Sequence, residues 1–573
     1  MTDTSYPRPQ LRRSNYELLD GVAGFAFDDS DVGLSEGWHV RADVFDREII
    51  LPFSPESPAS GIADTGFHSV VWYRLKIESK AAVGERVILH FGAVDRIADV
   101  WVDGHHVGHH EGGQTAFAFD VTTSLTNGVV IVRAQDDPLD TVAPRGKQDW
   151  HEEPHSIWYH RTTGIWRSVW AEVVPELHIT ELAWTPDVAG ANVNLEIALT
   201  ARPSVTMSVT VVLAGLSRVT VDTDSDRVVI DVPIARLRNG QAIEELLWTP
   251  EHPHLIEATV LLSTGDSVDS YFGLRTVSIA HGQLMLNDRP FPLRSVLQQG
   301  YWPTSHFTAP SVEHMRSEVE LIKRLGFNSI RIHQKVEDPR YLYFCDSLGL
   351  TVWAEAAAAY EFSARAIELF TTDWTRIVRA QISHPSIITW VPFNESWGIQ
   401  HISHVPAQRA YSIALTQLTR AIDPSRPVIS NDGWEHTDSD IVTIHDYENS
   451  SEVLRDRYGS PESVREVLST FSGPGRRMGA PGTTLGATPV MLTEFGGVRL
   501  GGSQQDWGYS TAATPDELQR RLEELFAVVH ASPVLSGFCY TQLADTGQEV
   551  NGLCDENRVP KLPEHIIRAI VAG

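Results

Sequence analysis

Cysteine is scarce in this chain, which has three among 573 residues: Cys345, Cys539 and Cys554. An odd number without any CxxC spacing argues against a disulfide framework and against a thiolate zinc site. No apolar run reaches the roughly 20 residues that a membrane helix needs, and the N-terminal stretch MTDTSYPRPQLRRSNYELLD lacks the apolar core of a secretion signal. These absences predict a cytoplasmic protein without a membrane partner.

Positive charge is also in short supply. The chain has 46 Lys and Arg against 74 Asp and Glu, so its formal net charge is −28. A surface this acidic repels phosphate backbones, and nucleic acid is therefore excluded as a partner. The pattern leaves the oligomeric state open, homo-oligomers included.

Two stretches of β-pattern occupy the first half of the chain. Residues 1–175 contain short alternating runs such as VVWYRLKIE and RVILHF, bounded by Gly, Asp and Pro, which predict a β-sandwich. Residues 176–277 contain further β-branched runs separated by turn residues, as in a small immunoglobulin-like sandwich. Neither stretch shows a helical period of useful length.

From about residue 278 to residue 573, strand and helix patterns alternate, which indicates a parallel α/β fold. Eight strand-like runs with helical patterns between most of them predict a C-terminal (β/α)8 TIM barrel. These runs begin near residues 291, 329, 350, 386, 426, 441, 489 and 535.

Barrel enzymes carry their chemistry at the carboxyl ends of the strands, so the polar and aromatic residues there are the candidate site. They are Arg331, His333, Asn394, Glu395, Trp434, His445, Tyr447, Glu494, Tyr540 and Gln542.

Two carboxylates stand out within this set. Glu395 ends the apolar run ITWVPFN, and Glu494 ends the apolar run PVMLT. Because an apolar strand interior cannot hold a free charge, each glutamate should lie at the wet end of its strand. Strands 4 and 7 lie across the ring, so the pair could flank a glycosidic bond, one donating a proton and the other attacking. A lone glutamate there would usually just pair with a cation.

The motifs around these residues resemble those of glycoside hydrolase family 2, which includes β-galactosidases and β-glucuronidases. HPSIITWVPFNES (384–396) resembles the acid/base signature of the family, and MLTEFGG (491–497) resembles its nucleophile motif. FNSIRIHQ (327–334) is similar to its first barrel signature, and TTGIWRSVWAEVV (162–174) to part of its N-terminal sugar-binding domain.

The resemblance implies a retaining exo-glycosidase that needs no cofactor and acts on a carbohydrate substrate. Glu494 would be the nucleophile and Glu395 the acid/base. Asn394 would bind the 2-hydroxyl group of the sugar, Arg331 and Tyr447 would support the nucleophile, and Tyr540 falls where the family usually has a tryptophan under the sugar.

Departures from the family pattern bear on the substrate. The stretch ADTGQEVNGLCDENRVPK lacks the Asn-x-Lys pair that glucuronidases use on a carboxylate, so a galactose-type glycone, pyranose or furanose, is expected. A β-glucuronidase or another exo-glycosidase of the family is the alternative. The Glu-x-His pair behind the metal site of large β-galactosidases is missing after Trp353, so no catalytic metal is expected.

Three other hypotheses stay open from the residues alone. A non-catalytic carbohydrate-binding protein would need to have lost one glutamate, and both are present. An inverting glycosidase would hold its carboxylates about 6.5–9.5 Å apart. A lectin-like N-terminal sandwich would expose aromatic residues on one face.

Overall fold

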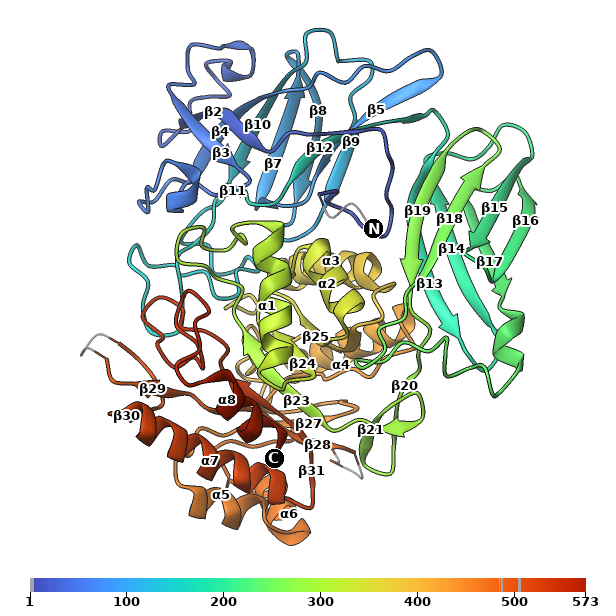
Figure 1. The fold of residues 1–573 in the computed structure, drawn as a ribbon. Coiled ribbons are helices and arrows are strands. Elements are labelled where there is room, and N and C mark those ends of the chain that lie inside the picture. The colour runs from blue at the N-terminus through green and yellow to red at the C-terminus, as the bar shows by residue number, and fades with distance from the viewer. Residues whose placement is uncertain (1–4, 472, 484, 486–487, 503–505) are drawn as a thin grey trace.

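The computed structural model describes residues 5–471, 473–483, 485, 488–502 and 506–573. Three parts follow one another along the chain. A β-sandwich comes first, a second sandwich follows, and an α/β barrel forms the remainder; in Figure 1 the first sandwich lies above the barrel and the second to its right. Within the described residues, no helix is long and apolar enough to cross a membrane.

The N-terminal sandwich has two antiparallel sheets. Buried side chains from both sheets form one core, which includes Phe25, Leu89 and Val100. One sheet has the order β1 (Tyr16–Leu18), β12 (Val169–Pro175), β5 (Glu85–Phe91), β9 (Phe117–Asp120), and the other β3 (Arg47–Leu51), β2 (Gly21–Phe27), β4 (Val70–Lys76), β10 (Val129–Gln135), β7 (Ile97–Val102), β8 (His105–Glu111). A further pair joins β6 (Val94–Asp95) to β11 (Gly164–Ile165).

The middle sandwich has seven strands in two sheets, as an immunoglobulin-like fold requires. Leu195 and Val211 come from opposite sheets and share one buried core. The sheets have the orders β13 (Ile179–Asp187), β14 (Asn192–Leu199), β17 (Arg227–Pro233) and β16 (Ser217–Thr223), β15 (Met207–Leu213), β18 (Ile256–Leu262), β19 (Ser267–Phe272). A small sheet of β20 (Val277–Ala280), β21 (Gln283–Leu286) and β22 (Arg289–Pro290) leads into the barrel.

The barrel sheet is parallel and curls around a packed interior. Its order is β26 (Ile387–Val391), β25 (Thr351–Glu355), β24 (Ser329–Ile332), β23 (Leu293–Gln298), β31 (Leu535–Thr541), β28 (Val490–Gly496), β27 (Val442–His445). The helices are α1 (Val312–Arg324), α2 (Pro339–Leu348), α3 (Ala364–Gln381), α4 (Pro406–Ile422), α5 (Ser451–Tyr458), α6 (Pro461–Ser469), α7 (Pro515–Ala531) and α8 (Glu564–Ala572). The short strands β29 (Val498–Leu500) and β30 (Ser510–Ala512) pair beside α7.

The fifth predicted strand is wrong as a regular strand. Residues 426–432 lie between β26 and β27, but they pair with the first of these only through two isolated bridges, Trp390 with Val428 and Asn394 with Asp432. The barrel sheet therefore has seven regular strands among the described residues, where eight were expected. The bridges have a direct use, because the second joins Asn394 to Asp432 at the mouth of the barrel.

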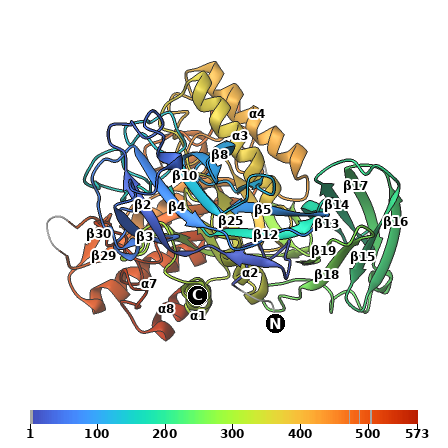
Figure 2. The same ribbon diagram turned by 90° about the horizontal axis from the view of Figure 1, so that it is seen from above.

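Local sequence signals explain where the barrel helices begin and end. Ser311 caps α1 by accepting a hydrogen bond from the backbone N–H of His314. Gly349 ends α2 in the left-handed conformation with φ of 75°, which glycine adopts without a Cβ clash. Helices α3 and α4 lie together along one edge of the molecule (Figure 2). The crossovers hold the carboxyl ends of the strands at one rim.

Candidate active site

Arg331 on β24 is the centre of the barrel mouth and is fully buried. Its Nη1 donates to Glu494 Oε1 at 2.8 Å, and its Nη2 donates to Asn394 Oδ1 at 2.5 Å. Its Nε faces Asp432 Oδ2 at 2.9 Å and also pairs with Glu355. One guanidinium thus connects groups from three strand ends and from the irregular segment that ends at Asp432, which its fixed fork of donors makes possible.

The buried carboxyl group of Glu494 is held in its ionised form by its neighbours. Besides the bond from Arg331, its Oε2 accepts a hydrogen bond from the Tyr447 hydroxyl at 2.5 Å. Burial alone would raise the pKa of Glu494, but the charges of His445 and Arg331, with the Tyr447 hydroxyl, outweigh it and lower that pKa. A carboxylate held charged in this way is suited to act as a nucleophile.

Glu395 sits on a strained turn just after β26. Its φ is 50° and that of Ser396 is 59°, both in the left-handed region that L-residues rarely adopt. The Glu395 backbone N–H donates to the Asp432 carbonyl at 3.0 Å, which holds the turn in place. The side chain, 16% exposed, is the more open of the two glutamates and reaches the cavity.

The two glutamates face each other. One oxygen of each and one ring nitrogen of His445 lie within 4.8 Å of one another. The sequence predicted two opposed carboxylates at this place, and the structure brings them together across the mouth, with His445 between them.

Asn394 has an unused donor. Its Oδ1 is taken by Arg331, which orients the amide, while its buried Nδ2 has no hydrogen-bond partner among the described residues. A buried donor left unpaired costs free energy, so an acceptor from a bound molecule would complete the site. The contact of Asn394 to a sugar hydroxyl stays a prediction.

A cavity of about 690 Å³ opens beside this pair. Four of the predicted residues line it: Glu395, Trp434, His445 and Tyr447. Its wall continues through Tyr509, whose ring stacks on that of Tyr447 at a centroid distance of 3.2 Å, and through Arg476, which lies 3.6 Å above the Trp434 ring.

His333 and Gln542 lie behind the cavity wall. The His333 Nδ1 is 3.1 Å from Glu355 Oε2, and burial and the charge of Arg331 lower the pKa of His333 well below its ordinary range. Gln542 donates to Asn551 at 2.7 Å and accepts from Gln299 at 2.8 Å. Neither residue lines the cavity, and a substrate contact of either one stays a prediction.

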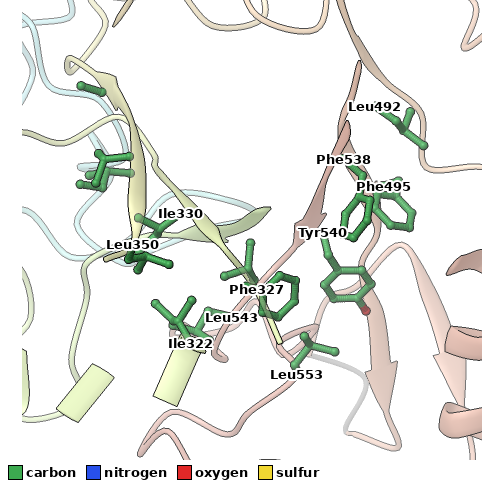
Figure 3. Close-up of a cluster of buried hydrophobic side chains, with 14 of the residues drawn as sticks. Ile322, Phe327, Ile330, Leu350, Leu492, Phe495, Phe538, Tyr540, Leu543 and Leu553 are labelled. Atoms are coloured by element: carbon green, nitrogen blue, oxygen red, sulfur yellow. The ribbon is translucent and has the colours of Figure 1, made fainter. Parts of the chain in front are cut away.

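The prediction that Tyr540 contacts substrate is wrong. Its side chain is fully buried and packs with Phe495 and Phe538 in the hydrophobic core (Figure 3). Side chains alternate along a strand, so its neighbour Thr541 faces the barrel interior, where it accepts a hydrogen bond from Tyr447 at 3.2 Å. The alternation in CYTQ was the signal that could have shown this.

The sequence analysis missed Lys147, Tyr159 and Glu549, which are all buried near the mouth. Tyr159 donates to Glu549 Oε2 at 2.5 Å, so the N-terminal sandwich and the segment after β31 meet there. No motif connects residue 147 with residue 549, because only the packing of two domains brings them together.

Glu395, His445 and Glu494 could in principle surround a metal ion, since their ligand atoms cluster. A protonated imidazole has no lone pair for a metal, however. Burial would lower the pKa of His445, but Glu494, Asp432 and Glu395 raise it to about 10. His445 therefore joins the two glutamates in an ion network.

Comparison with protein families places each part of the chain. The models described as "Glycosyl hydrolases family 2, sugar binding domain", "Glycosyl hydrolases family 2" and "Glycosyl hydrolases family 2, TIM barrel domain" match residues 16–171, 177–275 and 277–498. Together they cover both sandwiches and most of the barrel, in the order of the family.

Similar proteins carry names from the same family. A β-galactosidase of Thermoanaerobacter pseudethanolicus is 26% identical over 94% of this chain and 69% of its own length. A β-glucuronidase of Chlorocebus aethiops is 24% identical over 91% of this chain and 84% of its own length. A longer relative from Formosa agariphila is 26% identical over 423 residues. The chain spans about half of its length (48%).

Solved structures support the same fold. A family 2 β-galacturonidase from Eisenbergiella tayi, bound to galacturonate, superposes with a TM-score of 0.76 at 20% identity and covers 99% of both chains. With three family models in order and a barrel mouth carrying two opposed glutamates, this chain belongs to glycoside hydrolase family 2 and is a glycoside hydrolase.

Proposed function

We propose that the protein is a retaining exo-glycosidase that uses Glu494 as nucleophile and Glu395 as acid/base. In the first step a carboxylate oxygen of Glu494 bonds to the anomeric carbon, the glycosidic C–O bond breaks, and Glu395 gives its proton to the leaving oxygen. In the second step Glu395 takes a proton from water, which attacks the anomeric carbon and releases Glu494.

The observation that carries this proposal is the spacing of the two carboxylates. One oxygen of each lies within a 4.8 Å cluster. Retaining enzymes hold these groups about 5–5.5 Å apart, whereas inverting enzymes need about 6.5–9.5 Å to admit a water molecule. The nearest oxygens of the two glutamates are thus no more than 4.8 Å apart, which favours direct attack by Glu494 over attack by a water molecule held between them.

The surroundings of the pair support different tasks for the two glutamates. Glu494 receives hydrogen bonds from Arg331 and Tyr447, which stabilise it as an anion. Glu395 has neither of these partners and lines the cavity, where a leaving group can reach it. The unpaired Nδ2 of Asn394 supports a contact to the sugar.

For the glycone we propose a galactose-type sugar, as pyranose or furanose. Support comes from a relative named β-galactosidase and from the absence of the Asn-x-Lys pair after β31. A β-glucuronidase is the second candidate, because another relative carries that name. We place the enzyme in the cytoplasm, because its three cysteines are free and buried.

A panel of 4-nitrophenyl glycosides tests this proposal, with the anomer first released followed by proton NMR. Hydrolysis of the β-galactopyranoside or β-galactofuranoside with retained configuration is expected. Release of the inverted anomer would exclude the double displacement, and binding without hydrolysis of any glycoside would favour a non-catalytic carbohydrate-binding protein.

A further inference from the structure

Lys147 belongs to the N-terminal sandwich but ends at the mouth of the barrel. Only 6% of the residue is exposed, and within the described residues its ammonium group has no side-chain hydrogen bond or ion pair, yet it is not one of the fully enclosed unpaired atoms, so its donors stay accessible. The Nζ atom lies 5.5 Å from the centroid of the Trp397 ring and 5.8 Å from that of Tyr159. An ammonium group has three donors, and burial leaves them in need of acceptors.

The backbone on both sides of Lys147 is anchored. The N–H groups of Arg145 and Gly146 both donate to the Ala358 carbonyl at 3.0 Å, so the segment is tied to the barrel. Gly146 has a φ of 60°, and a Cβ at this position would lie 2.5 Å from the Gln334 carbonyl oxygen. Gln148 donates to Asp95 at 2.7 Å. The lysine is therefore presented from a rigid segment.

Trp397 connects this ammonium group with the catalytic pair. It follows Glu395 by two residues, and its backbone N–H donates to the Asn394 carbonyl at 2.9 Å. The Lys147 ammonium group thus lies beside the ring of the residue two positions after the acid/base, where the charges of Glu494 and Glu395 act on it.

Glu549 supplies the opposite charge. Its two oxygens accept hydrogen bonds from Tyr159 at 2.5 Å and from Asn551 at 3.1 Å, as suits an ionised carboxylate. Tyr159 also donates its backbone N–H to the Lys147 carbonyl at 2.8 Å and so links the two residues. Burial lowers the pKa of Lys147 and raises that of Glu549, while the charge of each opposes the shift of the other.

We propose that Lys147 is a substrate-binding residue that donates to hydroxyl groups of a neutral glycone, and that Glu549 is a positioning residue that keeps uronic acids out. The inference rests on the proposed function for the location of the glycone. Tyr159 holds Glu549 close to the lysine, while Arg331 and His445 are engaged with Glu494 and Glu395, so a sugar carboxylate would have to compete with Glu549 for the Lys147 charge.

Variants of Lys147 test the first half. Lys147→Met should raise KM for the neutral 4-nitrophenyl glycoside about tenfold or more, as expected for one lost charged hydrogen bond, and change kcat less. Lys147→Arg, which keeps the charge and the donors, should recover part of the loss. Lys76→Met, at an exposed lysine of the same sandwich, is the matched control and should behave as wild type. Unchanged KM in a folded Lys147→Met protein overturns the assignment.

Selectivity tests the second half. Wild type should bind D-galactose, D-glucose or D-mannose more tightly than the matching uronic acids by calorimetry, and Glu549→Gln should shift this ratio toward the uronic acid by about tenfold. Tighter wild-type binding of a uronic acid, lost in Lys147→Met, overturns the neutral-glycone inference. So does a failure to bind any of the three neutral sugars.

Binding is measured without turnover, so the two proposals can fail separately. A protein that binds a neutral sugar through Lys147 but hydrolyses no glycoside refutes the proposed function and leaves the inference standing. If the protein is a retaining hydrolase but its KM and sugar affinities are unchanged in the Lys147 and Glu549 variants, only the inference is refuted.

Discussion

The Nδ1 atom of His445 lies 2.8 Å from Glu395 Oε1. The same nitrogen is 3.4 Å from Glu494 Oε2, and the other ring nitrogen is 3.6 Å from Asp432 Oδ1. The His445 ring therefore lies between the two glutamates and contacts both of them. The sequence predicted a substrate contact for His445, whereas its position indicates that it also organises the carboxylates.

His445→Asn should make unfolding less dependent on pH. The pKa of His445 is raised from 6.5 to about 10 in the folded protein, so its contribution is complete below pH 6.5 and is lost as the pH rises to about 10. Across this window the free energy of unfolding of wild type should fall, relative to the variant, by about 1.4 kcal/mol per pH unit. Urea unfolding measures both proteins, and parallel pH profiles would contradict the prediction.

Glu494→Ala should lose turnover, with kcat reduced about 10⁴-fold or more, because the nucleophile is gone. Azide should fill the vacated space, restore part of the activity and give a glycosyl azide of inverted configuration, which NMR identifies. Circular dichroism should show an intact fold. Glu462→Ala, at an exposed position of α6, is the matched control. Turnover like that of wild type in Glu494→Ala would remove this residue from the mechanism.

Glu395→Gln should slow the hydrolysis of different substrates to different degrees, depending on the leaving group. A poor leaving group needs the proton of Glu395, so the first step should collapse. With dinitrophenolate, glycosylation should survive and hydrolysis of the intermediate should be slow, because the base is missing. Stopped-flow absorbance should show a burst followed by slow turnover. Equal slowing of both substrates without a burst would exclude Glu395 as acid/base.

Chelation should not affect activity. Arg331 and the His445 imidazolium already place positive charge beside Glu494, and a protonated imidazole cannot ligate a metal. Prolonged dialysis against EDTA should leave kcat/KM unchanged for the best glycoside of the panel. Loss of activity that returns on addition of Mg²⁺ would refute the prediction.

Strand ends were the most predictable part of this protein. An apolar strand interior cannot hold a free charge, so the apolar runs before Glu395 and Glu494 are enough to predict that both residues lie at the barrel mouth. Arg331 was one of the strand-end candidates, and the family resemblance implied that it supports the nucleophile; it donates a hydrogen bond to Glu494. The regular fifth strand did not follow, because residues 426–432 look strand-like yet pair through isolated bridges.

Sequence by itself determined the order of two sandwiches and a barrel, because residue periodicity is local and states which face of each element is apolar. Tertiary structure decided which side chains meet. The orientation of β31 put Tyr540 into the core and Thr541 beside Tyr447. The docking of the first sandwich carried Lys147 to the mouth of a barrel that begins more than a hundred residues later, since contacts between distant segments depend on packing and not on local pattern.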